Sequence, residues 1–173
     1  MATLIKNRRI AADHWRLLEP GADAALPEVP AEGGVIVPLA LWQARRAALL
    51  ARAGKLGVWL DSDQGPETLA GDLEHLALIA LKFPKVADGR GYSSARLLRE
   101  RYGFTGELRA IGEVLRDQLQ SMEQCGFDAF ALREDQDAEH ALLAFDDFSE
   151  AYQASAKQPV PLFRRQTVAG ANS

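Results

Sequence analysis

Residues 76–102 read LALIALKFPKVADGRGYSSARLLRERY. Leu76 to Phe83 is a nearly unbroken apolar run of strand length, and Pro84, which has no N–H to donate, ends it. The apolar positions that follow have helical spacing and predict a short amphipathic helix; they are Ala95, Leu98 and Tyr102. Gly103 is expected to stop this helix. The segment therefore predicts a strand, a loop and a helix, which is the repeating unit of parallel sheets.

The loop between this strand and this helix has the features of an anion site. It joins the carboxyl end of a strand to the amino end of a helix, which is where open parallel sheets bind ligands. Gly89 and Gly91 flank Arg90, so the backbone can approach a ligand closely. Arg90 and Arg96 supply positive charge. The alternative is that Asp88 pairs with Arg90 only to fix the turn.

Two polar positions further along the chain extend this predicted site. Arg109 falls in a predicted buried strand, where a guanidinium needs a partner. It either joins Arg90 around the same anion or forms an internal salt bridge with Asp88 or Asp117. Gln118 lies on the buried stripe of a predicted helix, and it either ties down a neighbouring loop or touches a ligand.

The predicted ligand-binding residues are Lys85, Asp88, Gly89, Arg90, Gly91, Tyr92, Ser93, Arg96, Arg109 and Gln118. No metal-ligand spacing is evident in the sequence, and no Ser-His-Asp or Cys-His arrangement assigns a catalytic residue.

Strand and helix alternate about five times along the chain. Further strands are predicted at 35–39, 56–60, 107–111 and 127–132, and helices at 41–54, 67–74, 113–125 and 138–152. Short connections predict an α/β fold, with a mostly parallel open sheet and helices on both faces; a partial (β/α) barrel is the alternative. We expect an N-terminal arm or hairpin packed on the core at 1–33, the α/β domain at 34–155 and a C-terminal tail at 156–173.

The overall composition limits the class of protein. A chain of 173 residues suits one domain with a sizeable core. The net charge of -4 argues against a general nucleic-acid binder. The single cysteine, Cys125, excludes an internal disulfide and an all-cysteine iron–sulfur site within one chain. The sequence has no apolar stretch of membrane-spanning length and no secretion signal, so we expect no membrane partner and a cytoplasmic location.

A resemblance to a known family is dense from about Leu76 to Tyr152 and thin before it. The segments that carry it are Phe83-Pro84-Lys85, Asp88-Gly89-Arg90-Gly91-Tyr92-Ser93, Ala95-Arg96-Leu97-Leu98-Arg99-Glu100-Arg101, Gly106-Glu107-Leu108-Arg109-Ala110, Asp117-Gln118-Leu119 and Gly126-Phe127-Asp128-Ala129-Phe130. In these segments the chain resembles a bacterial family of unknown function whose members are usually labelled as probable oxidoreductases involved in sulfite reduction. The resemblance implies a pathway, sulfur assimilation, more firmly than a reaction.

Three functions fit these observations. The first is a cytoplasmic protein linked to assimilatory sulfite reduction that binds a small oxyanion or phosphate-bearing ligand at the Asp88-to-Arg96 loop. The second is a nicotinamide-dependent oxidoreductase, because Gly89-x-Gly91-x-x-Ser94 follows a strand and Glu113 comes about twenty residues later. The third is a non-enzymatic docking partner of sulfite reductase. The sequence does not decide whether the protein is an enzyme, assigns no cofactor and leaves a homodimer open.

Overall fold

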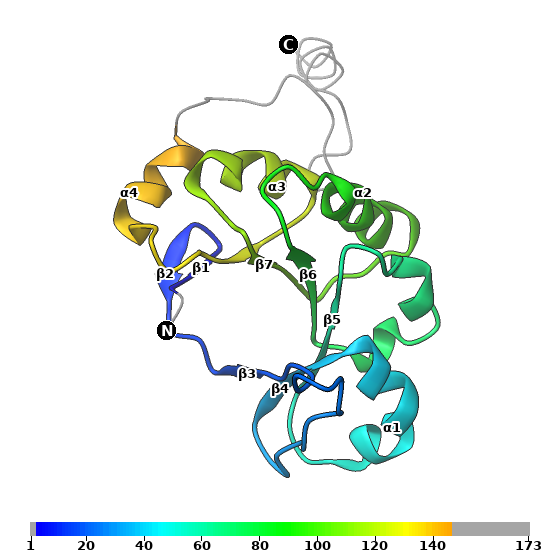
Figure 1. Ribbon diagram of the computed structural model, residues 1–173. Helices are drawn as coiled ribbons and strands as arrows, with labels where there is room; N and C mark the ends of the chain where they lie inside the picture. Colours follow the sequence, from blue (N-terminus) through cyan, green and yellow to red (C-terminus); the bar gives the residue numbers. More distant parts are fainter. Residues whose placement is uncertain (1–2, 147–173) are drawn as a thin grey trace, which may run out of the picture.

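The computed structural model describes residues 3–146, and they form a curled eight-stranded sheet with helices packed against it (Figure 1). The strands are β1 Leu4–Lys6, β2 Arg9–Ala11, β3 Trp15–Leu17, β4 Gly34–Pro38, β5 Leu56–Leu60, β6 Leu78–Phe83, β7 Glu107–Gly112 and β8 Ala129–Ala131. Their order across the sheet is β2-β1-β8-β7-β6-β5-β4-β3. The predicted C-terminal tail and the end of the last predicted helix lie outside the described residues.

The helical elements differ in their bounds from those that the sequence predicts. They are α1 Leu39–Ala51, α2 Arg90–Arg96, α3 Leu119–Cys125 and α4 Ala138–Leu142, with 3-10 turns at Pro66–Leu69, Leu73–His75, Arg116–Gln118 and Leu143–Phe145 and a π turn at Leu97–Arg101. The helix predicted at 67–74 is two separate 3-10 turns, and the helix predicted from residue 113 begins only at Leu119. None of the helices in the described part of the chain has the length and apolar character needed to cross a bilayer.

The α/β class is confirmed, but the prediction of a mostly parallel sheet is wrong because the sheet is mixed. β3 to β8 pair in parallel, as the alternation of strand and helix predicts. β1 is antiparallel to both of its neighbours, β2 and β8. The turn between β1 and β2 contains Asn7 and Arg8, both with positive φ, which suits a two-residue hairpin. Residues before 33 therefore contribute three strands to the same sheet.

The prediction of helices on both faces is also wrong. The sheet curls into a half-barrel, and Figure 1 shows α1, α2, α3 and α4 on its outer, convex side. The side chains explain this arrangement, because successive residues of a strand point to opposite faces. The convex face carries the large apolar cluster that includes Val35, Val58 and Phe130. The alternative prediction, a partial barrel, therefore describes the sheet better than an open sandwich does.

The concave face has a different character. A small apolar cluster there contains Ile36, Trp59, Leu78, Ala80 and Ile111, with Trp15 and Ala131 packed against it. Beside this cluster the register aligns Arg109 of β7 with Ala80 on one side and Ala129 on the other. Two alanines as neighbours leave space for a long guanidinium side chain on this face.

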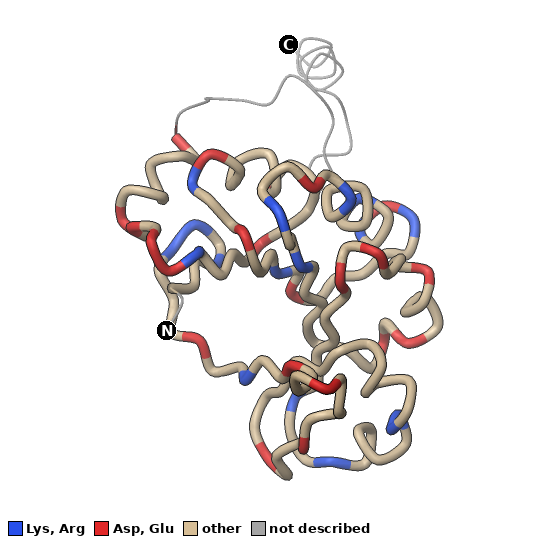
Figure 2. The backbone as a smooth tube through the Cα atoms, in the orientation of Figure 1, with Lys and Arg blue, Asp and Glu red and all other residues tan. Residues whose placement is uncertain are grey.

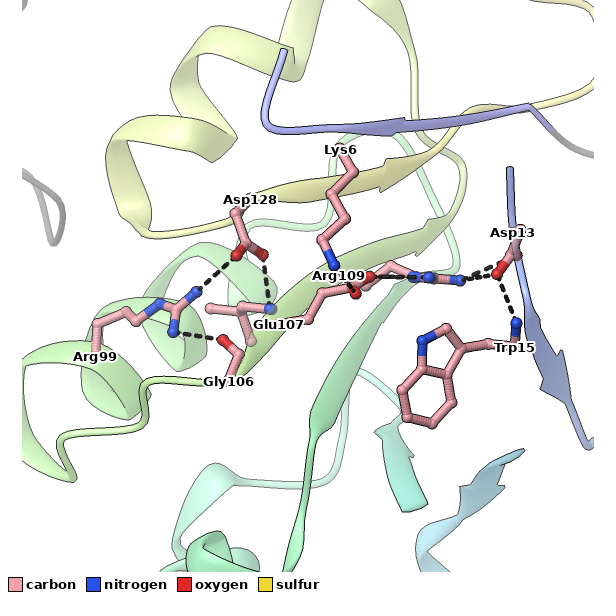
Figure 3. Close-up of polar contacts among 9 residues, drawn as sticks. Lys6, Asp13, Trp15, Arg99, Gly106, Glu107, Arg109 and Asp128 are labelled. Carbon is pink, nitrogen blue, oxygen red and sulfur yellow. Dashed lines mark hydrogen bonds and ion pairs between the residues drawn. The ribbon is translucent and has the colours of Figure 1, made fainter. Parts of the chain in front are cut away.

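Arg99 holds the convex layer to the sheet. Its guanidinium donates to the carbonyl oxygens of Gly126, Phe104 and Gly106 at 3.0, 2.8 and 2.8 Å. It also lies 3.7 Å from Asp128, whose carboxylate accepts a hydrogen bond from the Leu108 N–H at 2.8 Å (Figure 3). One side chain thus links the turns that precede β7 and β8.

We expect Arg99→Ala to lower the free energy of unfolding by about 2–4 kcal/mol, because it leaves buried carbonyls and the Asp128 carboxylate without their donor. Chemical denaturation monitored by circular dichroism measures this loss. Arg101→Ala, which removes an exposed arginine from the same π turn, is the matched control and should change stability by less than about 0.5 kcal/mol. Equal losses in the two variants would contradict this role for Arg99.

Candidate functional site

The loop after β6 places Arg90 at the start of α2, where its side chain is exposed and already paired. Nε and Nη2 of Arg90 donate to the two carboxylate oxygens of Asp88 at 3.1 and 2.8 Å, and Nη2 also donates to Ser62 Oγ at 2.9 Å. Hydrogen bonds from Arg90 hold the pKa of Asp88 well below its usual range. Asp61 and Asp63 add negative charge near the guanidinium. The loop after β6 is therefore less favourable to an anion than the sequence predicts.

Two other predicted ligand residues in the loop have packing roles. A Cβ on Gly91 would lie 2.5 Å from Cζ of Phe83, so this glycine allows α2 to sit directly on the ring. Tyr92 packs edge-on against the same ring with centroids 5.5 Å apart, and burial raises the pKa of its hydroxyl. Gln118 Nε2 donates to the Val86 carbonyl oxygen at 2.7 Å, which ties down the loop.

The remaining loop residues differ in their surroundings. Lys85, Gly89 and Ser93 are exposed. Arg96 is half-buried, lies 3.6 Å from Glu100 and acts on the thiol of Cys125. Burial raises the pKa of Cys125, and Arg96 offsets part of this rise. Ligand binding at this loop remains a prediction.

Arg109 lies elsewhere, at the centre of a charge network on the concave face, in which Arg109 and Glu107 are buried (Figure 3). Nε of Arg109 donates to Glu107 Oε1 at 2.8 Å, and Nη1 donates to both carboxylate oxygens of Asp13 at 3.1 and 3.0 Å. Lys6 Nζ donates to the other oxygen of Glu107 at 2.9 Å. The internal salt bridge is therefore real, but its partners are Glu107 and Asp13 rather than Asp88 or Asp117. Arg90 and Arg109 share none of these partners.

One nitrogen of Arg109 retains capacity to donate. Nη2 lies 2.8 Å from Glu107 Oε1, but this oxygen takes its aligned hydrogen bond from Nε. Within residues 3–146 no acceptor is aligned with Nη2, although the side chain is only 3% exposed. A buried donor without an acceptor is uncommon, and it is satisfied when a ligand or water binds.

Two adjoining cavities open on either side of this network. The first, the basic cavity, has a volume of about 440 Å³, and its lining includes Lys6, His14, Lys55, Glu107 and Arg109. Lys6, Lys55 and Arg109 there stand against two carboxylates, Glu107 in the lining and Asp13 bound to Arg109, so the local charge is positive. Gly33, Gly34 and Gly54 also line it, which brings backbone close to any ligand.

The second, the apolar chamber, has a volume of about 560 Å³. Its lining is mostly apolar and includes Leu17, Ile36, Ile111 and Ala131, with Asp13 and Arg109 as the charged groups. The two cavities share Leu4, Ala12, Trp15 and Arg109. Both volumes are in the range of pockets that hold small molecules.

Most of this site was missed by the sequence prediction. Lys6, Asp13, Trp15 and Lys55 come from segments with no recognisable motif. Glu107, however, carries a readable signal, because it precedes Arg109 by two positions and so lies on the same face of a strand. Opposite charges two residues apart in an otherwise apolar strand indicate a buried pair.

Comparison with known proteins identifies the family of this chain. The profile of a family described as "Bacterial protein of unknown function (DUF934)" matches residues 57–163, more than half of the sequence. The chain belongs to this family. The matched region begins at the second residue of β5 and contains β6, β7, β8 and the Glu107–Arg109 pair, whereas Lys6, Asp13 and Lys55 lie before it. No curated protein and no solved structure matches the chain.

We expect Gly91→Ala to cost about 1–3 kcal/mol of stability, because the added methyl group would overlap the Phe83 ring. Thermal and urea denaturation measure the loss. Gly89→Ala is the matched control, since nothing lies within 4 Å of its added Cβ, and it should be nearly neutral. A greater loss in Gly89→Ala would show that loop conformation matters more than this packing contact.

Cys125 should react slowly with Ellman's reagent in the native protein. The thiol is buried and its raised pKa lowers the thiolate fraction at any given pH, so the pH at which labelling begins is higher than for a free thiol. We expect labelling at pH 8 to be at least tenfold slower than in urea-unfolded protein. Equal rates would show that this thiol is accessible.

Proposed function

We propose that this DUF934 protein binds a small oxyanion or phosphate-bearing ligand in the basic cavity, with Arg109 as the central contact. The observation that carries the proposal is the buried Nη2 of Arg109, which lacks an aligned acceptor in the described protein and belongs to a side chain lining that cavity. Nη2 has an ion pair with Glu107 but no aligned acceptor, and a guanidinium in this state favours a tetrahedral or planar oxyanion. Lys6 and Lys55 in the same lining add to the attraction.

The charge balance favours this position over the Asp88-to-Arg96 loop. Arg90 is held by Asp88 and lies near Asp61 and Asp63, so an arriving anion meets three carboxylates. In the basic cavity an anion meets Glu107, which is paired with Lys6 and Arg109, and Asp13, which is paired with Arg109. With Lys55, three cationic side chains stand against these two carboxylates. Attraction between opposite charges is also stronger where water is partly excluded.

The proposal includes a place in assimilatory sulfite reduction, in the cytoplasm, on the strength of the family resemblance described above. Sulfite and sulfate are oxyanions of the size and charge that the basic cavity would accommodate. A nicotinamide-dependent oxidoreductase has less support, because Glu113, the acidic residue that would bind a ribose, accepts a hydrogen bond from Arg133 at 2.7 Å. Docking to sulfite reductase remains the non-enzymatic alternative.

Isothermal titration of the full chain with sulfite, sulfate and phosphate tests the proposal. We expect Arg109→Gln to weaken binding at least tenfold, because it removes a charged donor from a buried position. Arg90→Gln, the matched substitution at the loop, should leave affinity within about twofold. Loss of binding in Arg90→Gln, with binding retained in Arg109→Gln, would place the anion at the loop instead.

Arg109→Gln leaves Asp13 without its partner and can therefore destabilise the fold. The experiment needs a second variant that keeps the fold intact. Lys55 is exposed and lines the basic cavity, so Lys55→Gln should keep the thermal stability of the protein and weaken anion binding about two- to fivefold. If no anion binds the native chain, or if Lys55→Gln and Arg109→Gln both bind as the native chain does, the proposed site is wrong.

A further inference from the structure

The apolar chamber next to the basic cavity is larger than an inorganic anion needs. Its volume of about 560 Å³, in a cavity that is partly open to solvent, is larger than the roughly 150 Å³ enclosed cavity that holds a benzene ring. A tetrahedral oxyanion bound at Arg109 would leave this space unused. The chamber therefore indicates a ligand with a second, uncharged part.

We infer that the natural ligand is an organic anion, in which one sulfonate, carboxylate or phosphate group binds at Arg109 and an aromatic or other flat apolar body occupies the apolar chamber. The inference rests on the proposed function and adds the class of ligand. Arg109 lines both cavities and thus lies where the charged head of the ligand would join its body.

The lining of the chamber supports an aromatic body. Trp15 is half-buried, lines both cavities and packs with the concave cluster that includes Trp59 and Ile36. Its indole is held close to the sheet, because a Cβ on Gly34 would lie 3.0 Å from the ring. Indole faces favour flat apolar partners by stacking, and Ile111 and Ala131 supply apolar walls.

Exposure of the lining also indicates a way in. Leu17 lines the chamber from the edge strand β3 and is 40% exposed, so a ligand body there would remove a large apolar side chain from water. Asp13, whose carboxylate contacts Arg109, lies between β2 and β3 and is 34% exposed on its side chain. An anionic head would approach Arg109 beside this carboxylate and supply an aligned acceptor for Nη2, which otherwise has only its ion pair with Glu107.

Three probes separate the head of the ligand from its body: methanesulfonate has only the head, 2-naphthol has only the body, and naphthalene-2-sulfonate has both. We expect naphthalene-2-sulfonate to bind the full chain at one site and at least tenfold more tightly than either of the others, because burial of an aromatic ring adds to the ion pair. Isothermal titration gives affinity and stoichiometry. Equal affinity of the two sulfonates, or of naphthalene-2-sulfonate and 2-naphthol, would overturn the inference.

Matched leucine variants locate the body. Leu17→Gln should reduce the preference for naphthalene-2-sulfonate over methanesulfonate at least threefold, whereas Leu143→Gln, at another exposed leucine outside the chamber lining, should leave it unchanged. Ala131→Phe, which fills the chamber, should abolish the preference and leave methanesulfonate affinity intact. A preference that survives both chamber variants would place the ring elsewhere and overturn the inference.

The failures of the two proposals are distinguishable. If methanesulfonate binds with an affinity that depends on Arg109 and naphthalene-2-sulfonate binds no better, the anion site stands and the organic ligand class is wrong. If naphthalene-2-sulfonate binds equally well in Arg109→Gln and in the native chain, both proposals are wrong, because the head would then have no contact with the guanidinium.

Discussion

A guanidinium cannot be buried in a sheet without acceptors for its hydrogen bonds, and the arrangement around Arg109 meets this constraint with residues from distant parts of the chain. Glu107 comes from the same strand, whereas Asp13 comes from the connection between β2 and β3. This pairing draws the connection toward the concave face, between the two edge strands of the sheet (Figure 1). The charge network therefore shapes the cavities as well as neutralising its own members.

The two faces of the sheet have different roles. The convex face is continuous apolar surface covered by helices, and it supplies most of the hydrophobic stabilisation. The concave face mixes tryptophans, alanines and glycines with charged groups, so it packs less completely and retains space. Basic and acidic positions are interspersed along the described chain rather than gathered on one segment (Figure 2). Local geometry, rather than net charge, therefore creates the positive cavity.

The sequence predicts the local units of this fold better than their assembly. The apolar runs that became β4, β5 and β6 are visible because a strand buried on both faces is continuously hydrophobic. The sequence leaves an open sheet and a partial barrel as alternatives, and it does not show the antiparallel β1, because its partner β8 is remote in sequence. Arg109 was identified because a buried charge is conspicuous. Asp13 was not identified, because nothing local to an exposed turn indicates what it contacts.

The antiparallel position of β1 has a consequence for synthesis of the protein. Arg8, in the turn after β1, pairs with Glu123, 115 residues later, and β8 follows that residue. When β1 and β2 leave the ribosome, β8 has not yet been synthesised, so β1 cannot yet form its pairing with β8. Strands that remain unpaired can form wrong pairings, and folds with contacts between residues distant in sequence fold slowly. We therefore expect the β1–β2 hairpin to be among the last parts of the sheet to dock.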